Sequence, residues 1–231
     1  KELYLGKYEI REITAPYGMV VNGEVHTAEL TYAGQEVSIT ETAANFYNER
    51  QKVKVELSKT LETDELFGIG ANGEITAVSF GLYAAEDIAA ADGTVIPADG
   101  LLEIAGCNEN GKASFVTDIP VGAKLYVKEI AADSHYLLSD EQYPVVFEYA
   151  GQDTALAEIK VNDGKAIENE LIRGEIHGLK KDEDGKALGG AVIGLFKSDE
   201  TELTAETALL TATSAEDGSF SFVDIPYGSY I

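Results

Sequence analysis

The stretch that decides the fold is VKVELSKTLE, residues 53–62. At the two-residue period of a β-strand its side chains fall on two faces, with Val53, Val55 and Leu57 on one and Lys54, Glu56 and Ser58 on the other. Lys59 continues the apolar face, so the pattern predicts a lysine that points into the core. Because lysine is almost never fully buried without a partner, we hypothesise that Lys59 is one end of a covalent crosslink.

Strand signals extend outward from this stretch in both directions. Turn dipeptides occur at Asn22-Gly23, Asn72-Gly73, Asp92-Gly93, Asn110-Gly111, Asp163-Gly164 and Asp217-Gly218. Short alternating runs lie at residues 7–13, 25–32, 78–83, 124–130, 143–149, 191–196 and 219–223. Residues 86–91 fit a short helix or an acidic loop, and residues 202–210 fit a helix or a strand. The pattern as a whole predicts an all-β sandwich.

Composition narrows the classes of function. The 41 acidic and 17 basic residues give a formal charge of -24, which argues against binding to nucleic acid or to anionic membranes. The sequence has no apolar run long enough to span a bilayer and no signal-peptide pattern at residues 1–10. Its single cysteine, Cys107, is expected to be a loop or half-buried thiol. The three histidines lack metal-ligand spacing, so we expect neither a metal site nor a cofactor.

Internal repeats divide the chain into modules. Short segments recur, VTDIPVG at 116–122 as VDIPYG at 223–228, and FGLY at 80–83 as IGLF at 193–196. Asn48 precedes Lys59 by 11 positions, and Asn169 precedes Lys180 by the same 11. The phase of the repeat predicts the C-terminal part of one module at 1–50, a complete module at 51–173 and the N-terminal part of a further module at 174–231.

Two more polar residues interrupt apolar faces. Glu129 shares a strand face with Leu125, and Asn169 shares one with Ile167. The set of three suits amide formation, because burial favours a neutral, nucleophilic amine on Lys59 and a protonated Glu129. The acid would polarise the Asn169 carbonyl and shuttle protons while ammonia leaves. The alternative is a buried Lys–Glu ion pair beside a hydrogen-bonded asparagine.

Two segments resemble a known family. Residues 8–18, YEIREITAPYG, resemble the "YxLxExxAPxGY" box of collagen-adhesin B-type (Cna B) repeats, which also occurs in Gram-positive pilins. Residues 180–191, KKDEDGKALGGA, resemble the opening "KxD…G…LxGA" of that family. The resemblance implies tandem transthyretin-like, inverse Ig-type sandwiches with spontaneous Lys–Asn isopeptide bonds. It places such a bond between Lys59 and Asn169, with Glu129 as the assisting acid.

The incomplete modules carry parts of the same set. The resemblance extends to Glu12 and Asn48 in the first module and to Lys180 in the third. Asn45 competes with Asn48 and Lys181 competes with Lys180. The 11-residue spacing favours Asn48, and strand parity favours Lys180 as the inward residue. The complete module lacks an Ala-Pro pair after its glutamate, so its loop is expected to differ.

The resemblance implies stalk or backbone modules of a secreted, cell-wall-anchored adhesin or pilin, whose anchor and signal peptide lie outside this segment. Autocatalysis once per molecule is not turnover, so we do not expect an enzyme. Expected partners are neighbouring modules and, through head-to-tail complementation, Lys180 of one chain with Glu12 and Asn48 of the next. The alternative is an adhesin domain that recognises a host protein or glycan, with the acidic insertion between Tyr83 and Gly106 as the candidate place.

Overall fold

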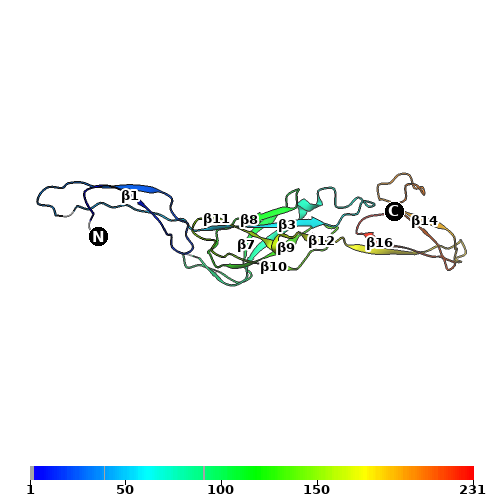
Figure 1. Cartoon of the computed structure of the whole chain (residues 1–231). Helices are drawn as coiled ribbons and strands as arrows, with labels where there is room; N and C mark the ends of the chain where they lie inside the picture. Colours follow the sequence, from blue (N-terminus) through cyan, green and yellow to red (C-terminus); the bar gives the residue numbers. More distant parts are fainter. Residues whose placement is uncertain (1–2, 39, 91) are drawn as a thin grey trace.

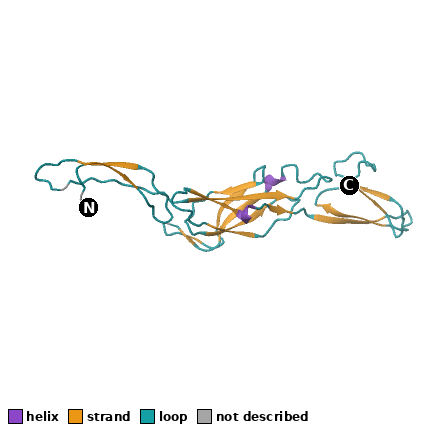
Figure 2. Ribbon diagram, viewed as in Figure 1, coloured by secondary structure: helices purple, strands orange, loops and turns teal. Residues whose placement is uncertain are grey.

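The computed structural model describes residues 3–38, 40–90 and 92–231, and these form an elongated molecule. Three parts follow one another along one long axis, with the middle part the largest (Figure 1). Strands dominate, and the described helical residues are two 3-10 turns, η1 (Glu74–Ala77) and η2 (Val161–Gly164) (Figure 2). The prediction of an all-β class is confirmed.

The middle part is a sandwich of two four-stranded sheets. One sheet has the order β10-β9-β4-β7, and the other has the order β11-β3-β12 with β8 on the remaining edge of β3. Their bounds are β3 Lys52–Leu61, β4 Ser79–Ala84, β7 Leu101–Gly106, β8 Lys112–Phe115, β9 Lys124–Ala131, β10 Gln142–Val146, β11 Leu156–Lys160 and β12 Ile167–Asn169. β11 and β12 both run parallel to β3, whereas β8 is antiparallel to it. The first strand of this part therefore lies beside its last.

The main core lies between these two sheets. It is built from the apolar faces predicted by strand parity, among them Val53, Val55, Leu57, Phe80, Leu82, Phe115, Leu125, Val127, Phe147 and Ile167. Lys54 and Ser58 are half-buried on the opposite face of β3, as the period of two predicts. Cys107 lies in the loop that follows β7, as one of the two expectations had it, but it is buried in this core and not half-buried. Its backbone N–H donates to Val78 O, which draws the residue inward next to β4.

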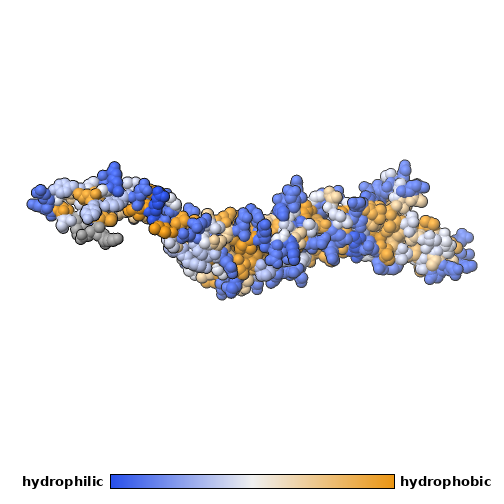
Figure 3. Space-filling view, viewed as in Figure 1, coloured by the Kyte–Doolittle hydropathy of each residue, from blue (hydrophilic) through white to orange (hydrophobic). Residues whose placement is uncertain are grey.

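Each of the two outer parts has paired strands, and a small hydrophobic cluster is buried in the third part. In the first part β1 (Gly6–Arg11) pairs antiparallel with β2 (Val25–Leu30). In the third part β13 (Arg173–Leu179) pairs with β16 (Ser219–Pro226), and β14 (Val192–Leu195) pairs with β15 (Leu210–Thr213). A small core forms there around Leu195, Phe222 and Ile225. On the face shown in Figure 3, apolar side chains reach the surface in separate patches broken by hydrophilic residues.

The acidic insertion contains a small hairpin. β5 (Ile88–Ala89) pairs with β6 (Val95–Ile96). Of the two alternatives for residues 86–91, the short helix was wrong and the loop holds for residues 86–87, whereas Ala91 lies outside the described residues. Ile88 is buried against the main core, which draws this segment into extended pairing. Residues 202–209 form neither a helix nor a strand, and β15 begins only at Leu210.

Glycine packing explains one of the repeats. A Cβ added at Gly81 would lie 2.5 Å from the ring of Tyr83, and one added at Gly194 would lie 2.7 Å from the ring of Phe196. In both places the aromatic ring two residues further along covers the glycine. The recurrence of glycine before an aromatic residue is therefore a shared packing requirement of the two strands.

Candidate crosslink site

Lys59 lies on β3 with its side chain in the core, and only 3% of the residue is exposed. Its Nζ donates to two backbone carbonyls, Thr60 O at 3.0 Å and Ile167 O at 3.1 Å. Burial lowers the pKa of Lys59 from its ordinary value, and the nearby charge of Glu129 opposes that shift. The site therefore favours the neutral amine more than water does.

Glu129 reaches the lysine from the opposite sheet. It lies on β9, is 2% exposed, and places Oε1 at 3.9 Å from Lys59 Nζ. Its Oε2 also accepts a hydrogen bond from the backbone N–H of Ser139 at 2.9 Å. The carboxyl group is thus held between the two sheets by contacts on both sides.

Asn169 completes the cluster from β12. This strand runs parallel to β3, with Ile167 opposite Lys59 and Asn169 opposite Leu61, so the lysine and the asparagine point inward from adjacent strands. The Asn169 Nδ2 donates to Glu129 Oε1 at 2.9 Å and to Oε2 at 3.0 Å. The fold therefore brings together the three residues that the sequence analysis selected.

One atom of the cluster is unsatisfied. The Oδ1 of Asn169 is buried and has no hydrogen-bond partner among the described residues. Buried polar atoms in native proteins nearly always have a partner, and leaving one unpaired costs about 1–3 kcal/mol. The asparagine is therefore not the fully hydrogen-bonded residue that a plain ion-pair site requires.

The first part of the chain reproduces half of this cluster. Asn48 Nδ2 donates to Glu12 Oε2 at 2.5 Å and to Val20 O at 2.9 Å, and the backbone N–H of Asn22 donates to the same Glu12 oxygen at 2.6 Å. Asn45 is exposed, whereas Asn48 is half-buried. Among the described residues, no lysine makes a hydrogen bond or ion pair with Glu12 or Asn48.

Lys180 occupies the backbone position equivalent to Lys59. The N–H of Lys59 donates to Gly111 O at 2.7 Å, and the N–H of Lys180 donates to Gly218 O at 2.7 Å. The prediction that the Lys180 side chain points into a core was nevertheless wrong, because the side chain is exposed. Residues 174–231 place no glutamate or asparagine strand over it, and Ile176 on the same face is exposed as well.

Sequence reasoning missed two neighbours of the site. Ser139 contributes its backbone N–H, which no residue pattern reveals, although its distance of ten positions from Glu129 matches that of Asn22 from Glu12. Cys107 lies near Lys59 and Glu129, and burial raises the pKa of its thiol to about 11. The thiol therefore stays protonated and unreactive at neutral pH.

Other kinds of site find little support in the described part of the chain. Its His, Cys, Asp and Glu side chains form no group that could hold a metal ion. Within residues 3–38, 40–90 and 92–231, no helix has the length and apolar character to cross a membrane. The buried Lys59–Glu129–Asn169 cluster is therefore the best-defined chemical feature of these residues.

Comparison with known proteins finds one family model and several solved structures that are similar to this chain. Residues 174–231 match the family model described as SpaA, a prealbumin-like fold domain. The TIE protein of Bacillus anthracis is similar with a TM-score of 0.65 and 23% identity, over 99% of this chain and 36% of its own. A streptococcal ancillary pilin matches with a TM-score of 0.34 and 20% identity, over 99% of this chain and 65% of its own. A C-terminal fragment of the pilus adhesin SpaC from Lactobacillus rhamnosus GG matches with a TM-score of 0.43 and 12% identity, over 76% and 71%.

No curated protein sequence matches this chain. The chain spans 36% of the TIE protein, and at 23% identity the likeness is one of fold. The match to the SpaA model begins at residue 174, where the repeat phase places the start of a module. Residues 174–231 thus match a SpaA-type prealbumin-like domain, and the resemblance of the chain to Cna B-type and pilin-like modules of Gram-positive bacteria is confirmed.

Proposed function

We propose that this chain is part of the stalk of a Gram-positive surface protein, in which an isopeptide bond between Lys59 and Asn169 locks the middle module. The observation that carries the proposal is the buried cluster, where Glu129 contacts both the lysine amine and the asparagine amide. A buried lysine, a buried carboxyl group and an unpaired amide oxygen are costly as separate features. A crosslinking reaction gives all three one role.

The reaction begins with a proton transfer. Moving one proton from Lys59 Nζ to Glu129, 3.9 Å away, converts the ion pair into a neutral amine and a carboxylic acid. A half-turn of the Asn169 amide then exchanges Nδ2 for Oδ1, so that the acid donates to the oxygen that now lacks a partner. That hydrogen bond withdraws electrons from the amide carbon and makes it a better electrophile.

Bond exchange follows from this arrangement. The lone pair of Lys59 Nζ attacks Asn169 Cγ, and the oxygen takes up the displaced electron pair under the Glu129 hydrogen bond. Glu129 carries the proton lost by the lysine nitrogen to Nδ2, and the Cγ–Nδ2 bond breaks to release ammonia. One amide replaces another, so no oxidant or cofactor is needed. Holding the groups in place supplies roughly 7–11 kcal/mol of the barrier in favourable intramolecular cases.

The position of the bond suits a stalk. It joins β3, the first strand of the middle sandwich, to β12, its last strand. Tension that enters through one end strand would pass through a covalent bridge into the other, without pulling the sheets apart. The module would therefore resist mechanical extension and proteolysis.

Contacts at the first junction keep neighbouring parts aligned. The Tyr149 hydroxyl donates to Met19 O at 2.8 Å, and the N–H of Val21 donates to Gln152 O at 2.9 Å. The side-chain oxygen of Gln152 accepts from the N–H of Ala15 at 2.9 Å. A loop of the middle part is thus hydrogen-bonded to three residues within the 15–21 stretch of the first part, which favours a stiff connection.

The second junction is held by charge and by aromatic packing. Arg173 lies 2.7 Å from Glu62, 3.1 Å from Asp64 and 3.5 Å from Asp224, and so links the end of β3 to β16 of the third part. Nearby, the rings of Phe67 and Tyr230 meet edge to face with centroids 5.5 Å apart. These contacts support a rod with stiff joints.

Intact mass spectrometry tests the proposal directly. The chain should weigh less than its sequence sum by one ammonia for each bond, and proteolysis should yield a branched peptide that joins Lys59 to Asn169. A Glu129→Gln variant should keep the full mass of its sequence. The control Glu86→Gln makes the same change of charge at an exposed position away from the cluster, and it should still lose ammonia. A full mass for the unmodified chain would refute the crosslink.

The hydrogen-bonded Glu12–Asn48 pair carries a second proposal. It has the acid and the amide of a crosslink site, whereas Lys180 has the matching backbone position with an exposed side chain. Lys180 of one copy is therefore a candidate nucleophile for Asn48 of another. Ladders that survive denaturing gels, and that Lys180→Arg abolishes while Lys181→Arg does not, would support pairing between copies. A single denatured monomer band at high protein concentration would exclude it.

A further inference from the structure

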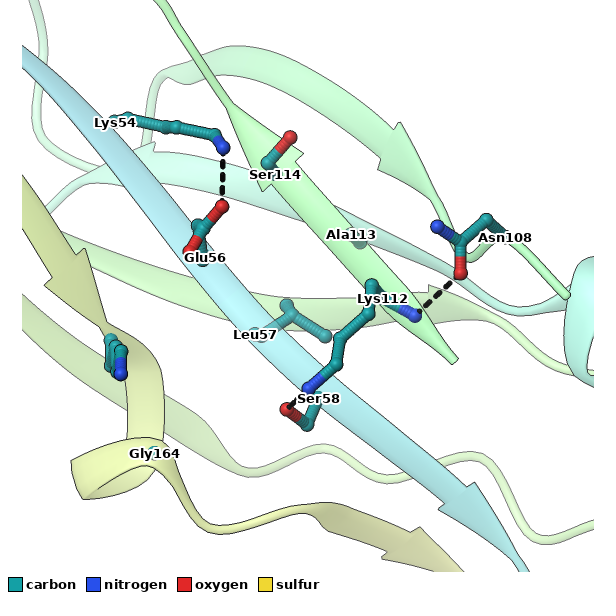
Figure 4. Close-up of a pocket in the computed structure, with 10 residues that line it drawn as sticks. Lys54, Glu56, Leu57, Ser58, Asn108, Lys112, Ala113, Ser114 and Gly164 are labelled. Atoms are coloured by element: carbon teal, nitrogen blue, oxygen red, sulfur yellow. Dashed lines mark hydrogen bonds and ion pairs between the residues drawn. The ribbon is translucent and has the colours of Figure 1, made fainter. Parts of the chain in front are cut away.

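The outer face of the β3 sheet carries a groove that the crosslink does not use. It lies over β3 and β8 beside the η2 turn, on the opposite side of the sheet from Lys59, and holds about 480 Å³ (Figure 4). A volume of this size falls within the range of small-ligand sites, about 300–1,000 Å³. Its lining mixes polar and apolar groups, and the polar ones include the hydroxyls of Ser58 and Ser114 and the amide of Asn108.

The groove is cationic in an acidic protein. Lys54, Lys112 and Lys160 line it against one acid, Glu56, which gives a net charge of +2 where the whole chain carries -24. Lys54 pairs with Glu56, and their hydrogen bond raises the pKa of the lysine and lowers that of the glutamate. Both groups therefore stay charged and largely cancel each other.

The other two lysines supply the free charge. Lys112 Nζ donates to Ser58 Oγ at 2.5 Å, which fixes the ammonium over the groove with donor capacity left (Figure 4). Lys160 lies across from Glu56 on the neighbouring strand, and its charge helps to lower the pKa of that carboxyl group, but among the described residues it makes no close ion pair. Two ammonium groups with hydroxyl and amide neighbours can bind a carboxylate and several hydroxyls at once.

We propose that this groove binds a short acidic saccharide, with the sugar carboxylate between Lys112 and Lys160 and the sugar hydroxyls on Ser58, Ser114 and Asn108. The hydroxyl and amide groups of the lining can hydrogen-bond sugar hydroxyls, and the apolar part of the lining can pack against the sugar ring. The remaining charge of the chain limits the ligand to a short one, because a long polyanion would run beyond the groove onto acidic surface. Screening over about 8–10 Å at physiological salt confines the attraction to the groove.

The test is an NMR titration of the whole chain with a disaccharide that contains glucuronic acid. Backbone amides of Ser58, Lys112 and Ser114 should shift, and a neutral disaccharide of the same size should leave them unchanged. The double variant Lys112→Gln/Lys160→Gln should weaken binding by about tenfold or more, because it removes both charge-assisted hydrogen bonds to the sugar carboxylate. Lys124→Gln/Lys128→Gln, with the same charge change on the other sheet, should weaken it by less than about twofold.

Three results would overturn the proposal. In the first, the backbone amides of the groove would stay unshifted at a saturating concentration of the acidic disaccharide. In the second, the neutral disaccharide would shift these amides equally. In the third, both double variants would lose affinity to the same extent. A tetra-aspartate peptide that shifts the same amides at lower concentration would reassign the groove to acidic peptides. None of these results bears on the crosslink, because that is read from mass.

Discussion

Removing the crosslink without stranding a buried charge is the sharpest test of how the middle module is stabilised. The variant Lys59→Met/Glu129→Gln deletes the nucleophile and the acid together and leaves neutral side chains of similar volume in the core. A single change at either position would leave the other charge buried and unpaired, which costs about 3–5 kcal/mol by itself. The double change avoids that cost, because replacing a whole buried pair by neutral groups is often close to neutral.

The expected loss follows from the loop that the bond closes. Lys59 and Asn169 are separated by 110 positions. The chain-entropy relation for a crosslink over a loop of that length gives about 4.8 kcal/mol at 25 °C. For a module of this size, a loss of 4–5 kcal/mol corresponds to a fall in the unfolding temperature of about 15–20 °C.

Calorimetry and intact mass together make the assay decisive. The middle module of the double variant should unfold about 15–20 °C lower and weigh its full sequence mass. The control Lys128→Met/Glu148→Gln makes the same charge change on outer faces and should change stability by less than about 0.5 kcal/mol. An unfolding temperature equal to that of the control, in a protein whose parent has lost ammonia, would refute the loop-closure argument.

Three further predictions concern the pH dependence, a close backbone approach and the second junction. In Asn169→Ala, Lys59 stays a free buried amine with a lowered pKa, so the unfolded state binds more protons and stability rises with pH from neutral toward the ordinary lysine value of 10.5. The unfolding free energy of this variant should therefore approach that of Lys59→Met/Asn169→Ala as the pH rises. A difference between the two variants that stays constant with pH would contradict the burial effect. Gly111→Ala places a Cβ 2.2 Å from Lys59 O at a φ of +66°, whereas Gly73→Ala has a positive φ with open space around the added Cβ. Chemical denaturation should show a loss of stability for Gly111→Ala several times the roughly 1–2 kcal/mol expected for Gly73→Ala. Equal losses would argue against the close approach. Arg173→Ala should change the unfolding free energy of the middle module by about 1 kcal/mol or less. NMR relaxation should nevertheless show the third part moving independently of the middle part in this variant, and not in the control Arg11→Ala. Unchanged joint tumbling in Arg173→Ala would show that the contact between Phe67 and Tyr230 alone holds the junction.

Much of the middle sandwich follows from local pattern. Alternation along β3, β9 and β12 predicts which side chains are buried, and the structure buries Lys59, Glu129 and Asn169 on those faces. This works because successive side chains of a strand must point to opposite faces, whatever the strand pairs with. The alternation rule failed at Lys180, because a strand face is buried only if another layer covers it. Residues 174–231 do not cover the face that carries Lys180.

The sequence by itself determined the β class, the inward residues of the middle module and the repeat that relates Lys59 to Lys180. The tertiary structure alone decided that Asn169 lies on the strand beside Lys59, that Glu129 reaches both from the opposite sheet, and that the amide oxygen is left unpaired. It also gathered Lys112 and Lys160 over one groove from separate strands. The physical reason is that strand alternation is a local property of the backbone, whereas contacts between strands depend on pairing and register, which the whole chain sets when it buries its core.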